Sequence, residues 1–538
     1  MVGQEAIGVQ TPSRGHPRRW FILSVLVLSL IVVVLDNTIL NVAMKTIADP
    51  VHGLGASQSQ LAWSVNSYTL VFAGLLFTFG VLGDRIGRKR MLLGGLLLFG
   101  LTSALSAYAQ DPTQLILARA GMGVGAAAIM PATLAILTNV FDPRDRAKAI
   151  GIWSGAVGIG VAIGPVVGGT LLEHFWWGSV FLVNVPVVAA ALLAIWLVAP
   201  ESRNPLNVKL DFVGVVLSIV GLVALTYGII EGGDSADWSR PLVWGSILLG
   251  VVVLVAFVLY ERSISHPALD VRLFKERRFA SASAAIAVVF FAGMGLFFFM
   301  TFYLQIVQDL SPLETGLMFL PFAVSMSIFS PLSASLVKRF GPRAVAVVGM
   351  SAVTFVFSGY LLLDADSPLW NVVLMFLVQG AGMSLVMPPA METIMASLPR
   401  EKAGVGSAVG NTLRQVGGSL GIAVLGSLLS QLYRSDVTGK LESSGLPGLD
   451  VDTAAESIAS TYGAVQSYGG AGAAVLDSAT DSFIAAMHTT AIVSALVGVA
   501  GVVLVAVLFP RKEAAAPEPD TPDEASQDRK PEPALADS

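Results

Sequence analysis

The sequence predicts an all-α integral membrane protein with fourteen transmembrane helices, and three observations support this prediction. Of the 538 residues 54% are hydrophobic, and only 13% are charged, which is about half of the roughly 25% typical of soluble proteins. Apolar runs of about 20 residues, the length that spans a bilayer, recur along the chain. Lysine and arginine gather in alternate connections between these runs. A soluble multidomain protein is therefore excluded.

The apolar runs follow one another in two groups. The first group contains 20–43, 60–82, 91–110, 113–140, 147–170, 179–199, 210–230 and 241–260. The second contains 279–303, 313–337, 344–362, 368–391, 403–432 and 483–509. The first run is too long for a cleaved signal peptide, carries an acidic residue, and lacks a cleavage site of small residues.

The distribution of positive charge predicts the orientation. With the N-terminus placed in the cytoplasm, 26 of the 32 lysine and arginine residues fall in cytoplasmic segments, as the positive-inside rule requires. We therefore expect an even number of spans in the cell membrane, with both termini cytoplasmic.

Composition also excludes several function classes. The net charge of −5 gives no case for nucleic-acid binding. Cysteine is absent, which excludes disulfides, thiolate metal sites, iron–sulfur clusters and thiol catalysis. No HExxH motif and no nucleotide-binding loop occur in the sequence. We expect no enzyme activity, no metal and no cofactor.

A glycine-rich basic segment joins the second and third runs. Its marked residues are Gly80, Gly83, Asp84, Arg85, Gly87 and Arg88. The glycines predict a tight turn in which two backbone segments approach closely. The aspartate predicts a carboxylate that faces a helix N-terminus. A weaker copy of this motif lies between runs 313–337 and 344–362, at 336–343, and it lacks the aspartate. The alternative to a specific role is a basic loop that only sets topology, but the repetition predicts two homologous halves.

Small residues mark one face of the run 147–170. They are Gly151, Gly160, Gly164, Pro165, Gly168 and Gly169. Three of these glycines are spaced by four residues, so they form a smooth strip on one helix face, and the proline favours a bend. Generic packing of small residues between helices is the alternative explanation.

Two opposite charges lie inside predicted spans. Asp36 is about seven residues, roughly 10 Å, from the outer end of its run, and Arg119 about six residues, roughly 9 Å, from the outer end of its own. Because the two charges are level and each is costly alone in a membrane, we expect them to interact. Such a carboxylate can exchange a proton for a cation; the alternative is a permanent structural ion pair.

These motifs together resemble those of the major facilitator superfamily, in particular its fourteen-span drug:proton antiporters of the multidrug and quaternary-ammonium type. The resemblance covers roughly 18–510 and includes Asn184 and Pro186 in the sixth run. It implies that segment 80–90 is a conformational-switch loop and that the strip of run 147–170 is the antiporter motif, packed between the halves. Met122 departs from this pattern, because the family usually has glutamine at that position.

The resemblance implies the major facilitator fold: two six-helix bundles with two extra helices between them. The expected divisions are a cytoplasmic N-tail at 1–19, bundles at 20–199 and 279–509, linker helices at 210–260, and a disordered cytoplasmic tail at 511–538. The long extracytoplasmic loop 433–482 is expected to form short amphipathic helices at 451–465 and 473–482 or, alternatively, a poorly ordered connector.

Further polar residues inside the spans are candidates for coupling or substrate binding. They are Arg414, Asn37, Asn66, Tyr303, Gln379 and Asn411. Arg414 could equally be a packed structural residue. Run 313–337 has only Glu314, at its outer edge, as an acid, which makes dications less favoured substrates.

The leading hypothesis is a proton-driven exporter of lipophilic drugs, antibiotics or other amphiphilic compounds by alternating access. Its expected partners are a cationic or neutral small molecule, protons and the lipid bilayer, and we expect it to act as a monomer. The alternative is an exporter or flippase of lipid or cell-envelope precursors.

Overall fold

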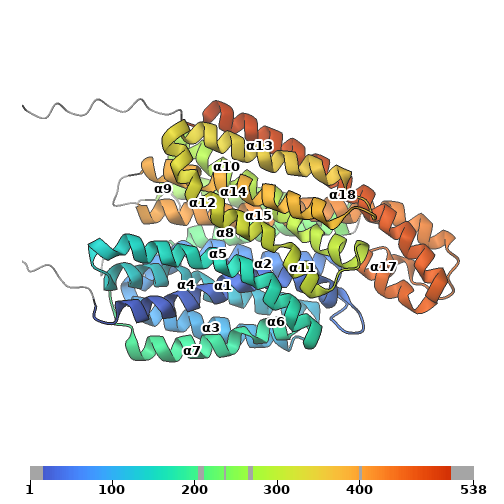
Figure 1. Cartoon of the computed structure of the whole chain (residues 1–538), viewed down its shortest axis with the longest axis horizontal. Helices are drawn as coiled ribbons and strands as arrows, with labels where there is room; N and C mark the ends of the chain where they lie inside the picture. Colours follow the sequence, from blue (N-terminus) through green and yellow to red (C-terminus); the bar gives the residue numbers. More distant parts are fainter. Residues whose placement is uncertain (1–15, 204–210, 235–237, 265–270, 399–402, 511–538) are drawn as a thin grey trace, which may run out of the picture.

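The computed structural model describes residues 16–203, 211–234, 238–264, 271–398 and 403–510. Across these ranges every regular element is a helix (Figure 1). The all-α prediction is therefore confirmed.

The N-terminal half consists of helices that correspond to the first six apolar runs. They are α1 (Arg19–Ala48), α2 (Gln58–Ile86), α3 (Arg88–Ala107), α4 (Pro112–Val140), α5 (Pro143–His174), and the pair α6 (Ser179–Leu182) and α7 (Asn184–Val198). Local chemistry sets several of the boundaries. Ser57 closes a capping box at the start of α2, and Asp111 caps α4 just before Pro112.

Two further helices follow, α8 (Phe212–Asp234) and α9 (Pro241–Ser263). Most of α9 is exposed, as expected of a helix that faces lipid. In contrast, α8 packs against both halves. The Ser427 hydroxyl of the C-terminal half donates to the Ile229 carbonyl at 2.9 Å, and Gly74 of α2 lies against Ile219.

The C-terminal half contains the remaining elements. They are η1 (Val271–Lys275), α10 (Arg277–Phe302), the π-helix η2 (Tyr303–Val307), α11 (Pro312–Met318), α12 (Leu320–Phe340), α13 (Pro342–Gly359), η3 (Tyr360–Leu362), α14 (Leu369–Ala396), α15 (Ala403–Ser443), α16 (Val451–Ala454), α17 (Ile458–Val465), η5 (Gln466–Tyr468) and α18 (Gly469–Leu508). Figure 1 shows this half lying alongside the N-terminal half, with the helices of both roughly parallel.

Twelve helices in the described ranges are long and apolar enough to cross a membrane, or thirteen if α2, bent by 54°, counts as one span. The remaining expected run, 147–170, lies in α5, a helix of 32 residues that is not among these thirteen. The count of fourteen therefore stays a prediction.

The segment 433–482 differs from a simple loop. Helix α15 continues to Ser443, and α18 begins at Gly469, so both helices project beyond the bundle. The short helices α16 and α17 fall within the expected range 451–465, but 473–482 is part of α18 instead of a separate surface helix. The Tyr433 and Thr461 hydroxyls lie 2.5 Å apart and tie α17 to α15, so the prediction of a poorly ordered connector is wrong.

The end of the bundle that carries segment 433–482 is here called the distal end. It lies on the right in Figure 1, opposite the start of α1 and the end of α18. There the Lys45 ammonium donates to the Gln305 carbonyl at 2.5 Å, and the Gln305 amide donates to the Val42 carbonyl at 2.9 Å. Lys45 also lies 4.8 Å from the centre of the Tyr462 ring in α17. These contacts join the two halves at the distal end.

Candidate proton-coupling site

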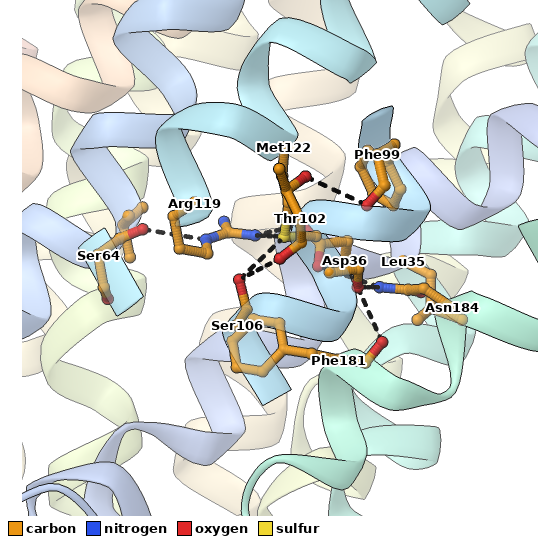
Figure 2. Close-up of polar contacts among 12 residues, drawn as sticks. Leu35, Asp36, Ser64, Phe99, Thr102, Ser106, Arg119, Met122, Phe181 and Asn184 are labelled. Atoms are coloured by element: carbon orange, nitrogen blue, oxygen red, sulfur yellow. Dashed lines mark hydrogen bonds and ion pairs between the residues drawn. The ribbon is translucent and has the colours of Figure 1, made fainter. Parts of the chain in front are cut away.

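The centre of the N-terminal half contains a buried ion pair between Asp36 of α1 and Arg119 of α4 (Figure 2). The exposed fraction of the Asp36 side chain is 0%, and that of Arg119 is 1%. The predicted interaction is confirmed. The prediction is based on the distance of each residue from the outer end of its apolar run. Residues at equal depth on two spanning helices can touch when the helices are neighbours.

Asp36 has a second hydrogen-bond donor that sequence reasoning did not assign to the site. The Asn184 amide, at the start of α7, donates to Asp36 Oδ1 at 3.3 Å and to the Ser103 hydroxyl at 3.1 Å. The Ser103 hydroxyl in turn donates to the Phe181 carbonyl at 2.8 Å. Each carboxylate oxygen of Asp36 thus has a donor. The family signature at Asn184 was the available signal.

Arg119 is held from several sides. Its Nε donates to the Ser64 carbonyl of α2 at 3.0 Å, as Figure 2 shows. The ring of Tyr68, one turn further along α2, lies 4.5 Å from the guanidinium carbon. The sulfur of Met122, where the family usually has glutamine, lies 3.8 Å from Arg119 Nη1 and accepts from the Ser106 hydroxyl at 3.4 Å. Methionine at position 122 therefore places a weakly accepting sulfur where the family usually has a glutamine amide.

The charge balance of this arrangement depends on whether Asp36 is ionised. Burying each charge costs several kcal/mol, roughly, and only the pairing and the added hydrogen bonds offset it. Protonation of Asp36 would remove the counter-charge and leave Arg119 with the Ser64 carbonyl and aromatic faces. The contacts of Arg119 described above therefore include one negatively charged partner, Asp36.

The glycine strip of α5 packs on the opposite face of α1. A Cβ at Gly160 would lie 2.9 Å from Val34, one at Gly164 would collide with the Thr38 hydroxyl, and one at Gly168 would lie 2.6 Å from Ile39. The shared face of these glycines is as predicted. The strip itself faces α1 of its own half.

Contact between α5 and the C-terminal half is made at neighbouring positions. Gly169 lies against Pro312 and Leu313 of α11, and the Pro165 carbonyl lies against Gly316. Among the motif residues whose surroundings are described, contact with the C-terminal half is seen at Gly169 and Pro165. Gly151 lies within α5, and its surroundings fall outside the described residues.

In the loop between α2 and α3, Gly87 is the glycine that the backbone requires. Its φ is +119°, and a Cβ there would lie 2.6 Å from a Glu201 carboxylate oxygen. The prediction of close approach at Gly80 is wrong, because its nearest neighbour would be at an ordinary 3.7 Å. Gly341 repeats the positive φ, at +86°, between α12 and α13. This repetition supports the prediction of two homologous halves.

The charged residues of the same loop have local partners. Asp84 accepts from Arg88 Nε at 2.8 Å, so its carboxylate lies against a side chain in the first turn of α3. Arg88 also donates to the Ala135 carbonyl of α4 at 3.3 Å. Arg85 is exposed.

Two of the other candidates lie on α2 and α15, helices of different halves that pack against each other. Asn66 of α2 is fully buried and accepts from the Ser419 hydroxyl of α15, while its Nδ2 has no partner among the described residues. Arg414 of α15 is half-buried, with its guanidinium carbon 5.8 Å from the centre of the Phe290 ring.

The remaining candidates are not brought to Asp36. The Tyr303 hydroxyl donates to the Asp364 carbonyl at 2.8 Å, which is a bracing contact near the distal end. Gln379 is buried and accepts from the Tyr360 hydroxyl at 3.2 Å. Asn37 and Asn411 are half-buried on α1 and α15. Within the described ranges, no cluster of three metal-ligating side chains occurs.

Two bundles of membrane-spanning helices and a buried ion pair in one of them define a secondary membrane transporter. The chain belongs to the Major Facilitator Superfamily, whose family model matches residues 26–422. Solved structures agree on the fold: a bacterial homolog of the human lysosomal transporter Spinster, in an inward-facing and unoccupied conformation, superposes with a TM-score of 0.64. The superposition has 19% identity and covers 93% of this chain and 99% of that one.

Curated relatives cover most of the chain. The multidrug efflux pump LfrA of Mycolicibacterium smegmatis is 35% identical over 94% of this chain and 99% of its own length. The methyl viologen resistance protein SmvA of Salmonella typhimurium is 34% identical over 89% and 95%. The puromycin resistance protein pur8 of Streptomyces alboniger is 37% identical over 77% and 82%.

Proposed function

We propose that this chain is a proton-driven multidrug exporter that exchanges an inward-moving proton for an outward-moving lipophilic small molecule. The relatives are named as efflux pumps or drug-resistance proteins, which favours this function over export of lipid or cell-envelope precursors. The single observation that carries the mechanism is the buried Asp36–Arg119 pair.

The proposed cycle turns on the charge of Asp36. With Asp36 ionised, the pair and the Asn184 hydrogen bond hold α1, α4 and α7 together. A proton arriving from outside neutralises the carboxylate, weakens this tie and permits the return of the empty transporter. One charge moving through 100 mV supplies about 2.3 kcal/mol, enough for roughly 50-fold accumulation.

A permanent structural ion pair is the competing interpretation. Replacing a buried pair with apolar residues is often neutral or stabilising, so stability alone is a weak reason for a transporter to contain one. The pair also lies on α1, whose other face packs on the glycine strip of α5. A change at Asp36 therefore acts on a helix in contact with α5, which in turn touches the C-terminal half.

The orientation and the substrate class are parts of the same proposal. We place both termini in the cytoplasm and the distal end outside, because lysine and arginine concentrate in the opposite connections. The transported molecule is a lipophilic cation or a neutral compound, the chain acts as a monomer in the cell membrane, and it performs no enzyme reaction.

The test is Asp36→Asn, which keeps the size of the side chain but cannot carry a proton. In cells expressing this variant we expect loss of proton-coupled ethidium efflux, measured by fluorescence, with normal amounts of protein in the membrane. The matched control is Asp366→Asn, the same change at an exposed position of the distal end, which should transport normally. Unchanged efflux by Asp36→Asn would show that Asp36 does not couple proton movement to export.

A further inference from the structure

Tyr68 of α2 is a fully buried tyrosine with no role in the mechanism so far. Its ring lies 4.5 Å from the guanidinium carbon of Arg119, on the helix whose Ser64 carbonyl also binds that guanidinium. A second ring, that of Phe181, lies further away at 5.9 Å. The face of Tyr68 is therefore the nearest aromatic surface to the cation of the proton-coupling site.

The position of Tyr68 is tightly held. Gly123 of α4 packs against its backbone so closely that a Cβ at Gly123 would lie 3.2 Å from the Tyr68 Cα. The ring of Phe72, one turn later, stacks at 6.0 Å. The phenol oxygen has no partner among the described residues, so the hydroxyl is not what holds the ring in place.

The charged groups that face Tyr68 come from three helices. Arg119 of α4 stacks on it, Asp36 of α1 binds Arg119, and Arg414 lies on α15, a helix that packs against α2. Two of these groups are arginines, which stay charged, and Asp36 is the one whose charge a proton removes. The ring therefore belongs to a local environment whose charge depends on one proton.

We propose that Tyr68 is a positioning residue of the proton-coupling site, whose ring holds and stabilises the Arg119 guanidinium when Asp36 is protonated. The negative face of an aromatic ring attracts a cation, and this attraction matters most once the carboxylate no longer compensates the charge. The ring thereby favours the proton-loaded state. This inference rests on the proposed proton coupling through Asp36.

The direction of the effect follows from this balance. Tyr68→Leu removes the ring face and makes a protonated Asp36 beside Arg119 more costly. Proton loading then requires a lower pH, by about half to one pH unit, given typical cation–π strengths. Tyr68→Phe keeps the ring and loses only the hydroxyl, so its midpoint should match that of the unmodified chain. Phe72→Leu removes a stacked ring that does not cover Arg119 and should also leave the midpoint unchanged.

The readout is independent of transport. In the purified full-length protein, infrared difference spectroscopy follows the carbonyl band of the protonated carboxylic acid against pH, and the Asp36 band is the one that Asp36→Asn lacks. The pH dependence of ethidium efflux is measured in parallel. In both measurements, we expect the pH midpoint to move to lower pH in Tyr68→Leu and to stay unchanged in Tyr68→Phe and Phe72→Leu.

Two outcomes overturn the inference. The first is an unshifted midpoint in folded Tyr68→Leu, with only a lower maximal rate, which would make Tyr68 merely structural. The second is an equal shift in Tyr68→Phe, which would assign the effect to the hydroxyl. Failure of the proposed function looks different: Asp36 would titrate and respond to Tyr68→Leu, while efflux would be independent of pH.

Discussion

At the scale of single residues, the central feature is a carboxylate whose two oxygens are bound by different helices. Arg119 binds Oδ2 and Asn184 binds Oδ1, both donors being fully or almost fully buried. A hydrogen bond to a charged group contributes about 1.5–3 kcal/mol. The charge state of Asp36 is thus set by a few contacts that can be removed one at a time.

Asn184→Ala removes the donor to Asp36 Oδ1 and should destabilise the charged carboxylate. Proton loading then occurs at higher pH, by about one to two pH units, opposite in direction to Tyr68→Leu. The pH dependence of efflux measures this shift. Ser103→Ala is the matched control, because it removes the other acceptor of Asn184 and leaves the Asp36 contact; a shift of equal size in that variant would contradict the assignment.

At the scale of elements, α1 makes different contacts on two of its faces. One carries Asp36 toward α4 and α7, and the other lies in the smooth strip of α5. Because glycine has no side chain, α5 approaches α1 closely at three successive turns. If protonation tilts α1, we therefore expect the movement to reach α5, and α11 through the contact at Gly169.

Gly164→Ala should force α5 away from α1, because the added Cβ would collide with the Thr38 side chain. We expect a loss of about 1–3 kcal/mol in stability, the usual cost of overpacking, together with reduced efflux. Thermal unfolding of the purified protein and ethidium efflux measure the two effects. Gly245→Ala, in an exposed part of α9 with no neighbour within 4 Å, should leave both unchanged or raise stability slightly.

At the scale of the whole molecule, the distal end is closed by contacts between the halves. The hydrogen bonds of Lys45 and Gln305 join α1 to η2. Pro50, just after α1, lies against Gly463 of α17, where a Cβ would be 3.2 Å from Pro50 Cδ. In the proposed orientation, with the distal end outside, alternating access would require these contacts to separate when the transporter opens outward.

A disulfide across this junction should arrest the cycle. The chain has no cysteine, so Pro50→Cys with Gly463→Cys introduces the only pair, at two positions that lie in contact across the junction. We expect ethidium efflux to stop on oxidation and to recover on reduction, while each single variant is insensitive to both. Full efflux with a completely formed cross-link would show that α17 and α1 do not part during transport.

Much of this architecture was predictable because membrane burial imposes simple rules. Length and hydropathy located the helices, since a bilayer core demands about 20 apolar residues and internally satisfied backbone groups. The cost of isolated charge in a membrane singled out Asp36 and Arg119, and equal depth predicted their contact.

What the sequence by itself determined is therefore the all-helical membrane class, the expected orientation and the principal pair of charges. Only the tertiary structure decided which faces the helices turn to one another: that Asn184 completes the Asp36 site, that Tyr68 covers Arg119, that the strip of α5 packs on α1, and that segment 433–482 folds into helices over the distal end. Hydropathy specifies depth along a helix, whereas rotation about its axis depends on packing among all its neighbours.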